Sequence, residues 1–328
     1  MEYLQLSNTD LTVSRFCMGG CPMGGYDWGD TKEEDFIEAI HAAIDHGVNF
    51  FDTADTYGLG QSEKTLAHGI KGKRQNVVIQ TKFGVRAEKG KKTIIDNSPE
   101  YLREALDQSL RRLQTDYIDI YVVHYWDQKT PPHTIIEELE RQKQAGKIRY
   151  YGLSNARSDA LELCKPYKGQ FATSQFEFSL CCRNWEADIR RTENMLDVTP
   201  MTWGSLGQGI LSGKYDENVK FGSNDRRRRE IYTNFHGDKL KHNMDIVKVL
   251  QEISAQRGLS CAAIAIRFIL DIFPKGVPIV GIKNACQLQD NILSQGWHLS
   301  LEEMTKLNRI SYSDPKDKMK EMPWKKEF

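Results

Sequence analysis

Hydrophobic residues in this chain occur in short runs that alternate with amphipathic segments from one end to the other. Eight runs are rich in Val, Ile and aromatic residues and are bounded by turn residues, a pattern typical of parallel strands buried on both faces. The predicted strands are residues 15–18, 48–51, 77–81, 117–123, 148–153, 173–178, 201–203 and 277–280.

The segments between these runs have the apolar spacing and end signals of helices. Residues 31–34 (Thr-Lys-Glu-Glu) show capping-box spacing, and Ser98-Pro99 places a cap residue before a proline at the first helical position. Gly47 and Gly146 lie where helices are expected to stop. Eight strand–helix repeats in 328 residues favour a (β/α)8 TIM barrel over an open doubly wound sheet. We therefore predict an α/β fold in which residues 1–328 form a single barrel domain.

Two connections are longer than the repeat requires. Residues 204–276 follow the seventh predicted strand, and we expect an elaborated loop over the barrel mouth, then helices at 238–256 and 261–270. The loop after the third strand, residues 83–98, carries a basic cluster, which we interpret as solvated surface. Its members are Arg86, Lys89, Lys91 and Lys92.

Composition narrows the classes of function. Lys+Arg and Asp+Glu both total 45, so no overall field favours nucleic acid or an anionic membrane. No apolar stretch is long enough to span a bilayer, and the first residues lack the features of a signal peptide. Seven cysteines without Cys-x-x-Cys spacing indicate reduced thiols, and we expect a cytoplasmic protein. The histidines show no metal-ligand spacing, so we expect no metal site, which argues against a metal-dependent barrel hydrolase.

Four polar residues stand at or just beyond the ends of predicted strands. Asp52, Lys82 and His124 close three successive runs, and Tyr57 follows the first of these. Because strand C-termini converge on one face of such a fold, we expect these side chains to meet there. Each residue alone would more often be structural, but together they make a proton-donating site.

This set suits the reduction of a carbonyl group, which creates a developing alkoxide that needs a proton. Free tyrosine, with a pKa of about 10, is a weak acid at neutral pH, and an adjacent ammonium lowers that pKa. We therefore expect Lys82 to lower the pKa of Tyr57 while Asp52 holds Lys82 charged and oriented. His124 would donate a hydrogen bond to the carbonyl oxygen.

The sequence around these residues resembles the signature of the aldo-keto reductases. The resemblance rests on Phe51-Asp52-Thr53-Ala54-Asp55-Thr56-Tyr57-Gly58, Glu63, Gln80-Thr81-Lys82 and His124, and extends from Cys17 to Asn291. It implies an NADP(H)-dependent oxidoreductase on a TIM barrel that reduces aldehydes or ketones to alcohols, with Tyr57 as the general acid/base.

No Gly-x-Gly-x-x-Gly fingerprint follows a predicted strand, so a Rossmann cofactor site is not supported. By resemblance, Ser154, Asn155 and Gln175 would bind the nicotinamide carboxamide, and Trp203 would stack on the ring. The Gly-rich segment 207–215 would clasp the pyrophosphate, with Lys214 adding charge. The remaining positions in the predicted cofactor set are Gly19, Gly20, Asp52, Gly204, Ser205, Leu206, Gly207, Gln208, Arg227, Gly281, Ile282, Lys283, Gln287, Asp290 and Asn291.

Within that set, Lys283 and Arg227 are candidates for the 2′-phosphate of NADP(H), while Gln287, Asp290 and Asn291 would face adenine. The segment 203–206 (Trp-Gly-Ser-Leu) departs from the family's common Tyr-Ser-Pro-Leu and is similar to a bacterial stress-protein branch. Asp290 replaces the more usual Glu.

A second interpretation comes from the potassium-channel β subunits, which share these motifs: a cofactor-binding, redox-sensing regulatory subunit with little turnover. As partners we expect only a small carbonyl or alcohol substrate, with neither nucleic acid nor membrane, and a monomer or weak homo-oligomer. Aromatic residues expected at the mouth do not select between an apolar and a sugar-like substrate. They are Tyr26, Trp28, Phe83, Tyr125 and Trp126.

Overall fold

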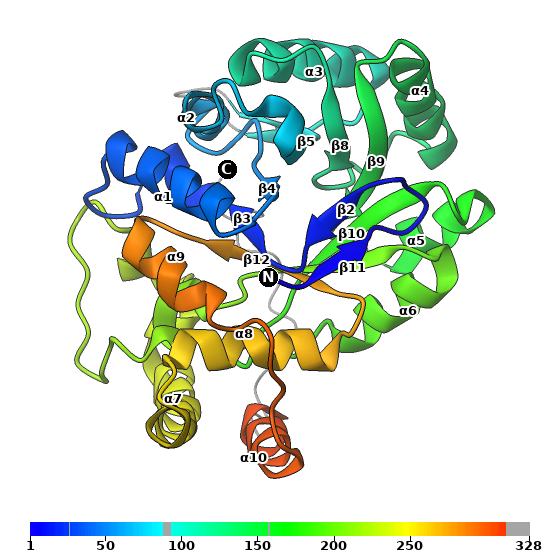
Figure 1. The fold of residues 1–328 in the computed structure, drawn as a ribbon. Helices are drawn as coiled ribbons and strands as arrows, with labels where there is room; N and C mark the ends of the chain where they lie inside the picture. The colour runs from blue at the N-terminus through cyan, green and yellow to red at the C-terminus, as the bar shows by residue number, and fades with distance from the viewer. Residues whose placement is uncertain (26, 88–92, 157, 313–328) are drawn as a thin grey trace.

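Parallel strands close into a barrel in the computed structural model, which describes residues 1–25, 27–87, 93–156 and 158–312 (Figure 1). In barrel order from the first, the strands are β3 (Cys17–Gly19), β4 (Phe50–Asp52), β5 (Val78–Phe83), β8 (Ile118–Val123), β9 (Ile148–Ser154), β10 (Phe171–Glu177), β11 (Thr199–Trp203) and β12 (Val277–Gly281). Each overlaps one of the predicted strands. The predicted (β/α)8 barrel is therefore confirmed.

Helices surround this barrel and cover its outer face (Figure 1). They are α1 (Glu33–Asp45), α2 (Gln61–Gly69), α3 (Pro99–Leu113), α4 (Pro132–Gln144), α5 (Ser158–Cys164), α6 (Glu186–Leu196), α8 (Cys261–Ile272) and α9 (Ala285–Ile292). Two more helices, α7 (Gly237–Arg257) and α10 (Leu301–Tyr312), pack together at the periphery. In the described ranges no single helix is long and apolar enough to cross a membrane. Helices α7 and α8 reach the required length and apolar composition only when they are taken together, and they are bent by 99° relative to each other.

The predicted helix starts were right at α3 and wrong in detail at α1. The Ser98 hydroxyl accepts a hydrogen bond from the backbone N–H of Tyr101 at 3.3 Å. At α1 the N-cap residue is Lys32 in place of Thr31, and no side chain caps the helix. The neighbouring Glu33 carboxylate is hydrogen-bonded to Thr65 and His68 of α2. The acidic first turn of α1 still complements the helix dipole.

A short hairpin that the hydrophobic pattern did not predict closes one end of the barrel. It pairs β1 (Tyr3–Gln5) with β2 (Thr12–Ser14) and lies across the barrel end in Figure 1. Leu6, Leu11 and Val13 pack among the side chains that fill the barrel interior. This end is therefore sealed, which leaves the C-terminal ends of the strands for a site.

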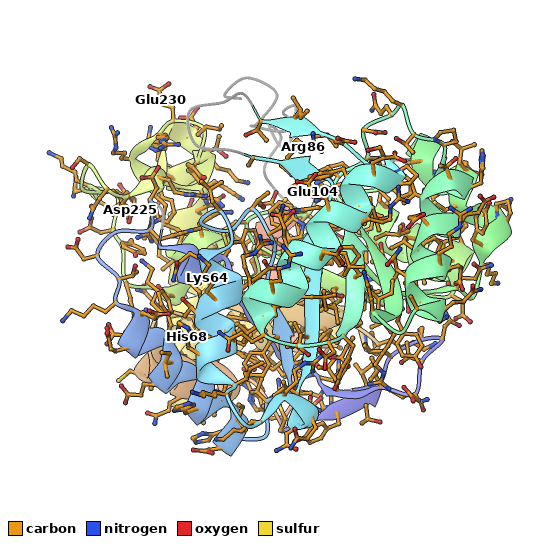
Figure 2. All side chains as sticks on the ribbon, turned by 90° about the horizontal axis from the view of Figure 1, so that it is seen from above. Lys64, His68, Arg86, Glu104, Asp225 and Glu230 are labelled. Carbon is orange, nitrogen blue, oxygen red and sulfur yellow. The ribbon has the colours of Figure 1, made fainter. Side chains whose placement is uncertain are left out.

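The two long connections lie toward the other end, where Figure 2 shows Glu230 and Arg86. The connection after β5 contains the antiparallel strands β6 (Val85–Arg86) and β7 (Ile94–Ile95). Arg86 lies on the surface and pairs with Glu104, in line with the predicted solvated position. Lys89, Lys91 and Lys92 lie outside the described residues. The connection after β11 contains three short helices: η4 (Gly207–Ser212), η5 (Arg226–Arg228) and η6 (Thr233–Phe235).

Candidate active site

A cleft of about 2400 Å³ opens at the C-terminal ends of the barrel strands and beneath the connection after β11. Every residue of the predicted catalytic and cofactor sets lines it except Gly20, Gly207 and Ile282. The side chain of Ile282 is buried in the hydrophobic core. Gly20 and Gly207 are held by backbone hydrogen bonds of 2.7 Å to Asp52 and Gly204.

A buried ion pair forms the floor of the cleft. Lys82 Nζ lies 2.6 Å from Asp52 Oδ1, and the two side chains are 2% and 3% exposed. The other carboxylate oxygen of Asp52 accepts hydrogen bonds from the side-chain amides of Gln80 at 2.8 Å and Gln175 at 2.7 Å. Because a buried charge is costly unless it is paired and hydrogen-bonded, these donors keep the carboxylate in one position.

Lys82 also connects this ion pair to Tyr57. Its ammonium donates to the backbone oxygen of Thr53 at 2.8 Å and to the Tyr57 hydroxyl at 3.3 Å. With Asp52 as the third partner, all three N–H donors of the ammonium are used. Asp52 at the end of β4 and Lys82 near the end of the neighbouring strand β5 therefore form one continuous hydrogen-bond chain that ends at the Tyr57 hydroxyl.

The acidity of Tyr57 differs from the prediction. Burial, and after it the Asp52 carboxylate, raise the pKa of Tyr57 well above its ordinary value. The sequence predicted a lowered pKa from Lys82, but burial is the largest influence, because it disfavours the charged tyrosinate. Tyr57 consequently keeps its proton at neutral pH.

His124 stands beside Tyr57 at the end of β8. The two rings meet edge to face with centroids 6.0 Å apart, and the imidazole stacks on Tyr125 at 4.6 Å. Burial, and then the nearby Lys82 ammonium, hold the pKa of His124 well below its ordinary value, so the ring is neutral. Its Nδ1 is buried and finds no hydrogen-bond partner among the described residues.

The ends of β9, β10 and β11 form a neighbouring wall. The backbone N–H of Asn155 donates to the Gln175 carbonyl at 2.9 Å, and the Asn155 amide bonds the carbonyl of His124 at 3.2 Å. The indole N–H of Trp203 donates to Asn155 Oδ1, also at 3.2 Å. Asn155 has a φ of 53° and so turns the chain sharply at the strand end. The predicted residues of this wall are thus brought together.

The far end of the cleft is basic. Arg227 is buried, not solvated: it lies 2.6 Å from Asp225, donates to the Tyr215 hydroxyl at 2.8 Å and packs 4.3 Å from the Phe221 ring centroid. Lys283 donates to the backbone oxygen of Trp28. Burial, and then the charge of Arg227, lower the pKa of Lys283, so the two cations are close enough to repel each other.

Comparisons with known proteins show the family to which this chain belongs. The model of the Aldo/keto reductase family matches residues 15–311. This chain belongs to the aldo/keto reductase family. The aldo-keto reductase YhdN of Bacillus subtilis (strain 168) is 32% identical over 321 residues, which are 96% of both proteins.

Solved structures of aldo-keto reductases share the whole fold. The glycerol dehydrogenase AKR11B4 from Gluconobacter oxydans has a TM-score of 0.86 at 28% identity, covering 98% of this chain and 99% of that one. The holo form of aldo-keto reductase AKR11C1 from Bacillus halodurans has a TM-score of 0.76 at 27% identity, with 94% and 96% covered.

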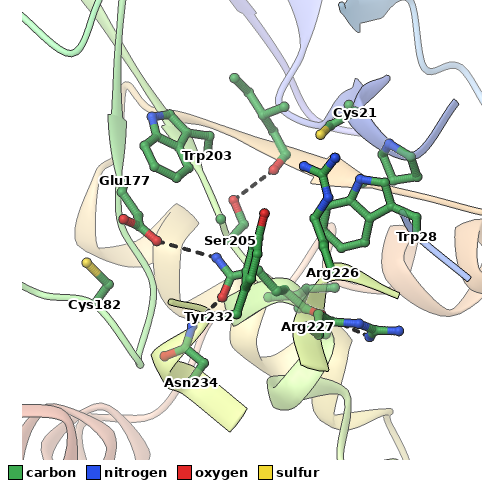
Figure 3. Close-up of a pocket in the computed structure, with 18 of the residues that line it drawn as sticks. Cys21, Trp28, Glu177, Cys182, Trp203, Ser205, Arg226, Arg227, Tyr232 and Asn234 are labelled. Atoms are coloured by element: carbon green, nitrogen blue, oxygen red, sulfur yellow. Dashed lines mark hydrogen bonds between the residues drawn. The ribbon is translucent and has the colours of Figure 1, made fainter. Parts of the chain in front are cut away.

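In this aldo/keto reductase a polar network that the sequence did not reveal crosses the cleft (Figure 3). Gln208 of η4 approaches the Glu177 carboxylate at 3.5 Å, and its side-chain oxygen accepts from Asn234 of η6. Glu177 could have been found, because it follows Gln175 at the two-residue period of a strand. Asn234 lies in a loop distant in sequence and carried no such signal.

The predicted aromatic mouth of the reductase is only partly present. Trp28 and Tyr125 line the cleft. Phe83 instead points away and stacks on Tyr121 at 4.9 Å, because residues alternate faces along β5 and Lys82 takes the inner one. Trp126 packs against the hydrophobic core, and Tyr26 lies outside the described residues. In the part of the chain that the structure describes, no group of His, Cys, Asp and Glu is arranged to hold a metal ion.

Proposed function

We propose that this protein reduces aldehyde or ketone carbonyls to alcohols with NADPH, in a reversible reaction that uses Tyr57 as the general acid/base. The observation that carries the proposal is the hydrogen-bond chain from Asp52 through Lys82 to the Tyr57 hydroxyl, with contacts of 2.6 and 3.3 Å. It ends in a cleft beside a neutral His124, where a carbonyl oxygen would find both a proton and a hydrogen-bond donor.

The lining of the cleft fits a phosphorylated dinucleotide. The η4 loop has positive φ at Gly207, Gln208 and Gly209, which turns its backbone in a way that can present N–H groups to a pyrophosphate. Lys283 and Arg227 repel each other, so a phosphate placed near both would relieve that repulsion. A relative from Schizosaccharomyces pombe, 29% identical over 282 residues (84% of this chain and 81% of that one), is named an aldo-keto reductase yakc [NADP(+)]. When bound, NADPH supplies the hydride for carbonyl reduction.

The residues of this chain then have defined roles in moving the proton. Tyr57 gives its hydroxyl proton to the oxygen that becomes the alcohol, and the resulting tyrosinate is stabilised by the hydrogen bond from Lys82. Asp52, held by two glutamine amides, keeps the ammonium oriented. His124 is neutral and has one N–H, which on Nε2 would donate to the same oxygen and align the substrate. In the oxidation of an alcohol the same groups act in reverse.

The test is a turnover assay with NADPH and NADH against a panel of aldehydes, ketones and sugar alcohols, followed by nicotinamide absorbance. We expect multiple turnovers with aldehydes and NADPH. A redox-sensing regulatory subunit would instead bind the nucleotide and consume no more than one equivalent, and this result would contradict the proposal.

Lys283→Ala should weaken NADPH binding by about ten- to a hundredfold, because a charge-assisted hydrogen bond contributes roughly 1.5–3 kcal/mol. NADH lacks the 2′-phosphate, so its affinity should barely change. Titration of both nucleotides by tryptophan fluorescence quenching measures the effect, which should shrink with added salt. Arg227→Ala should show the same selectivity, but with a lower melting temperature because Arg227 also packs the loop.

Lys241→Ala is the matched control, because the Lys241 side chain is 74% exposed on α7. It should leave both affinities unchanged. Equal weakening of NADPH and NADH in Lys283→Ala, or equal affinity of the wild type for both, would show that Lys283 does not meet the 2′-phosphate.

A further inference from the structure

Two adjacent arginines of η5 point to different places. Arg227 turns into the aromatic cluster beneath the loop, where it meets Asp225 and Tyr215. Arg226 extends into another part of the cleft, with its guanidinium carbon 5.3 Å from the ring centroid of Trp28. Figure 3 shows its side chain running alongside Trp28 toward Cys21. Both arginines therefore line the cleft, with Arg227 held by the aromatic cluster and Arg226 extending toward Cys21.

The charge of Arg226 acts on both sides of the cleft. Burial raises the pKa of the Tyr232 phenol, and the charge of Arg226 and its hydrogen bond oppose that rise. Burial likewise raises the pKa of the Cys21 thiol, again opposed by Arg226. Cys21 also interacts electrostatically with Tyr57. The guanidinium is thus placed between the loop and the proton-donating end of the cleft.

The backbone that carries Arg226 is firmly held. Its N–H donates to the carbonyl of Asp27 at 2.8 Å, and the flanking Asp225 forms an antiparallel bridge with Trp28. Arg229 pairs with the Asp27 carboxylate. Because these contacts fix the loop, a ligand that meets the guanidinium has little backbone left to order, which favours binding.

The wall of the cleft opposite Arg226 carries negative charge. Glu177 lies across the cleft from Arg226, with Trp203 and Tyr232 near it (Figure 3). An anionic group on a ligand would be repelled from the Glu177 wall and attracted to the Arg226 wall. Arginine is well suited to such a group, because its planar guanidinium can bind a carboxylate or phosphate with two parallel hydrogen bonds.

We propose that Arg226 determines specificity by binding a carboxylate or phosphate carried by the carbonyl substrate, with Tyr232 as a second donor and Trp28 as the supporting surface. This inference rests on the proposed function and narrows its substrate to anionic aldehydes or ketones. The nucleotide's own 2′-phosphate is assigned to Lys283 and Arg227, so Arg226 remains for the substrate.

The test compares substrates that differ only in charge. Succinic semialdehyde is paired with butanal, and glyceraldehyde 3-phosphate with glyceraldehyde, so the two arms distinguish a carboxylate from a phosphate. In Arg226→Gln we expect kcat/KM for the favoured anionic substrate to fall about ten- to a hundredfold, mainly through KM, because a charge-assisted contact is lost. The neutral partner and the NADPH affinity should stay unchanged, and Arg226→Lys should recover part of the loss.

Arg228→Gln is the matched control. Arg228 is the next but one residue, is exposed, donates to the Ser223 carbonyl and does not line the cleft. Equal losses for charged and neutral substrates in Arg226→Gln, or weaker NADPH binding, would overturn the proposal, because Arg226 would then serve the loop or the nucleotide. Absence of any preference for an anionic substrate in the wild type would also overturn it.

A measurement that needs no turnover separates this inference from the proposed function. Benzoate is titrated into the protein saturated with NADP+, with tryptophan fluorescence as the signal, since Trp28 supports Arg226. If no aldehyde is reduced, the proposed function fails, but saturable benzoate binding that is lost in Arg226→Gln would still support an anion site. Benzoate affinity that is equal in the wild type and Arg226→Gln would overturn it.

Discussion

Replacing Tyr57 with phenylalanine should lower kcat for carbonyl reduction by about two to four orders of magnitude, the usual contribution of a positioned general acid. The raised pKa of Tyr57 means that the phenol carries its proton at neutral pH, and the substitution removes only that proton donor. The ring and the cleft remain, so NADPH affinity should be nearly unchanged. Steady-state kinetics and fluorescence titration of the same preparation measure the two quantities.

Tyr121→Phe is the control for this variant. The Tyr121 hydroxyl is buried and has no hydrogen-bond partner among the described residues, so removing it should change neither turnover nor affinity appreciably. Near-normal turnover in Tyr57→Phe would show that the proton comes from elsewhere, and the proposed mechanism would be wrong.

Lys82→Met should be at least as damaging to catalysis. Without the ammonium, the developing tyrosinate has no hydrogen-bond donor from Lys82 and faces the uncompensated charge of Asp52, so the pKa of Tyr57 rises further. Reduction needs the protonated phenol, so its alkaline limit moves to higher pH. Oxidation needs the deprotonated phenol, so at any given pH it should lose more activity than reduction. Profiles of rate against pH in both directions test this expectation.

The same variant should also be less stable, because removing one partner of a buried ion pair typically costs about 3–5 kcal/mol. Adding Asp52→Asn removes the unpaired charge and should restore part of the free energy of unfolding in urea, but no activity. If the double variant regains activity, or if the single variant keeps an unchanged pH profile with substantial turnover, Lys82 does not act on Tyr57.

The hydrophobic pattern alone determined the barrel, since strands buried on both faces must be almost continuously apolar and their number and spacing leave little choice of fold. The same logic placed Asp52, Lys82 and His124, because strand ends converge wherever such a barrel closes. It failed for β1 and β2, which are three residues each and partly exposed, and so form no continuous apolar run. It also failed at the start of α1, where Lys32 and not Thr31 is the N-cap residue.

Properties that depend on distant neighbours were decided only by the tertiary structure. The pKa of Tyr57 is raised first by burial and then by the Asp52 carboxylate, and the extent of burial does not follow from the order of residues. Arg227 was a sequence candidate for the 2′-phosphate, but the order of residues did not show that it is buried, with Tyr215 and Phe221 packed against it. The path of Arg226 into the cleft depends in turn on the pairing of Trp28 with Asp225, which lie almost two hundred residues apart. Local periodicity carries no information about such contacts, because they arise only when the closed barrel brings its loops together.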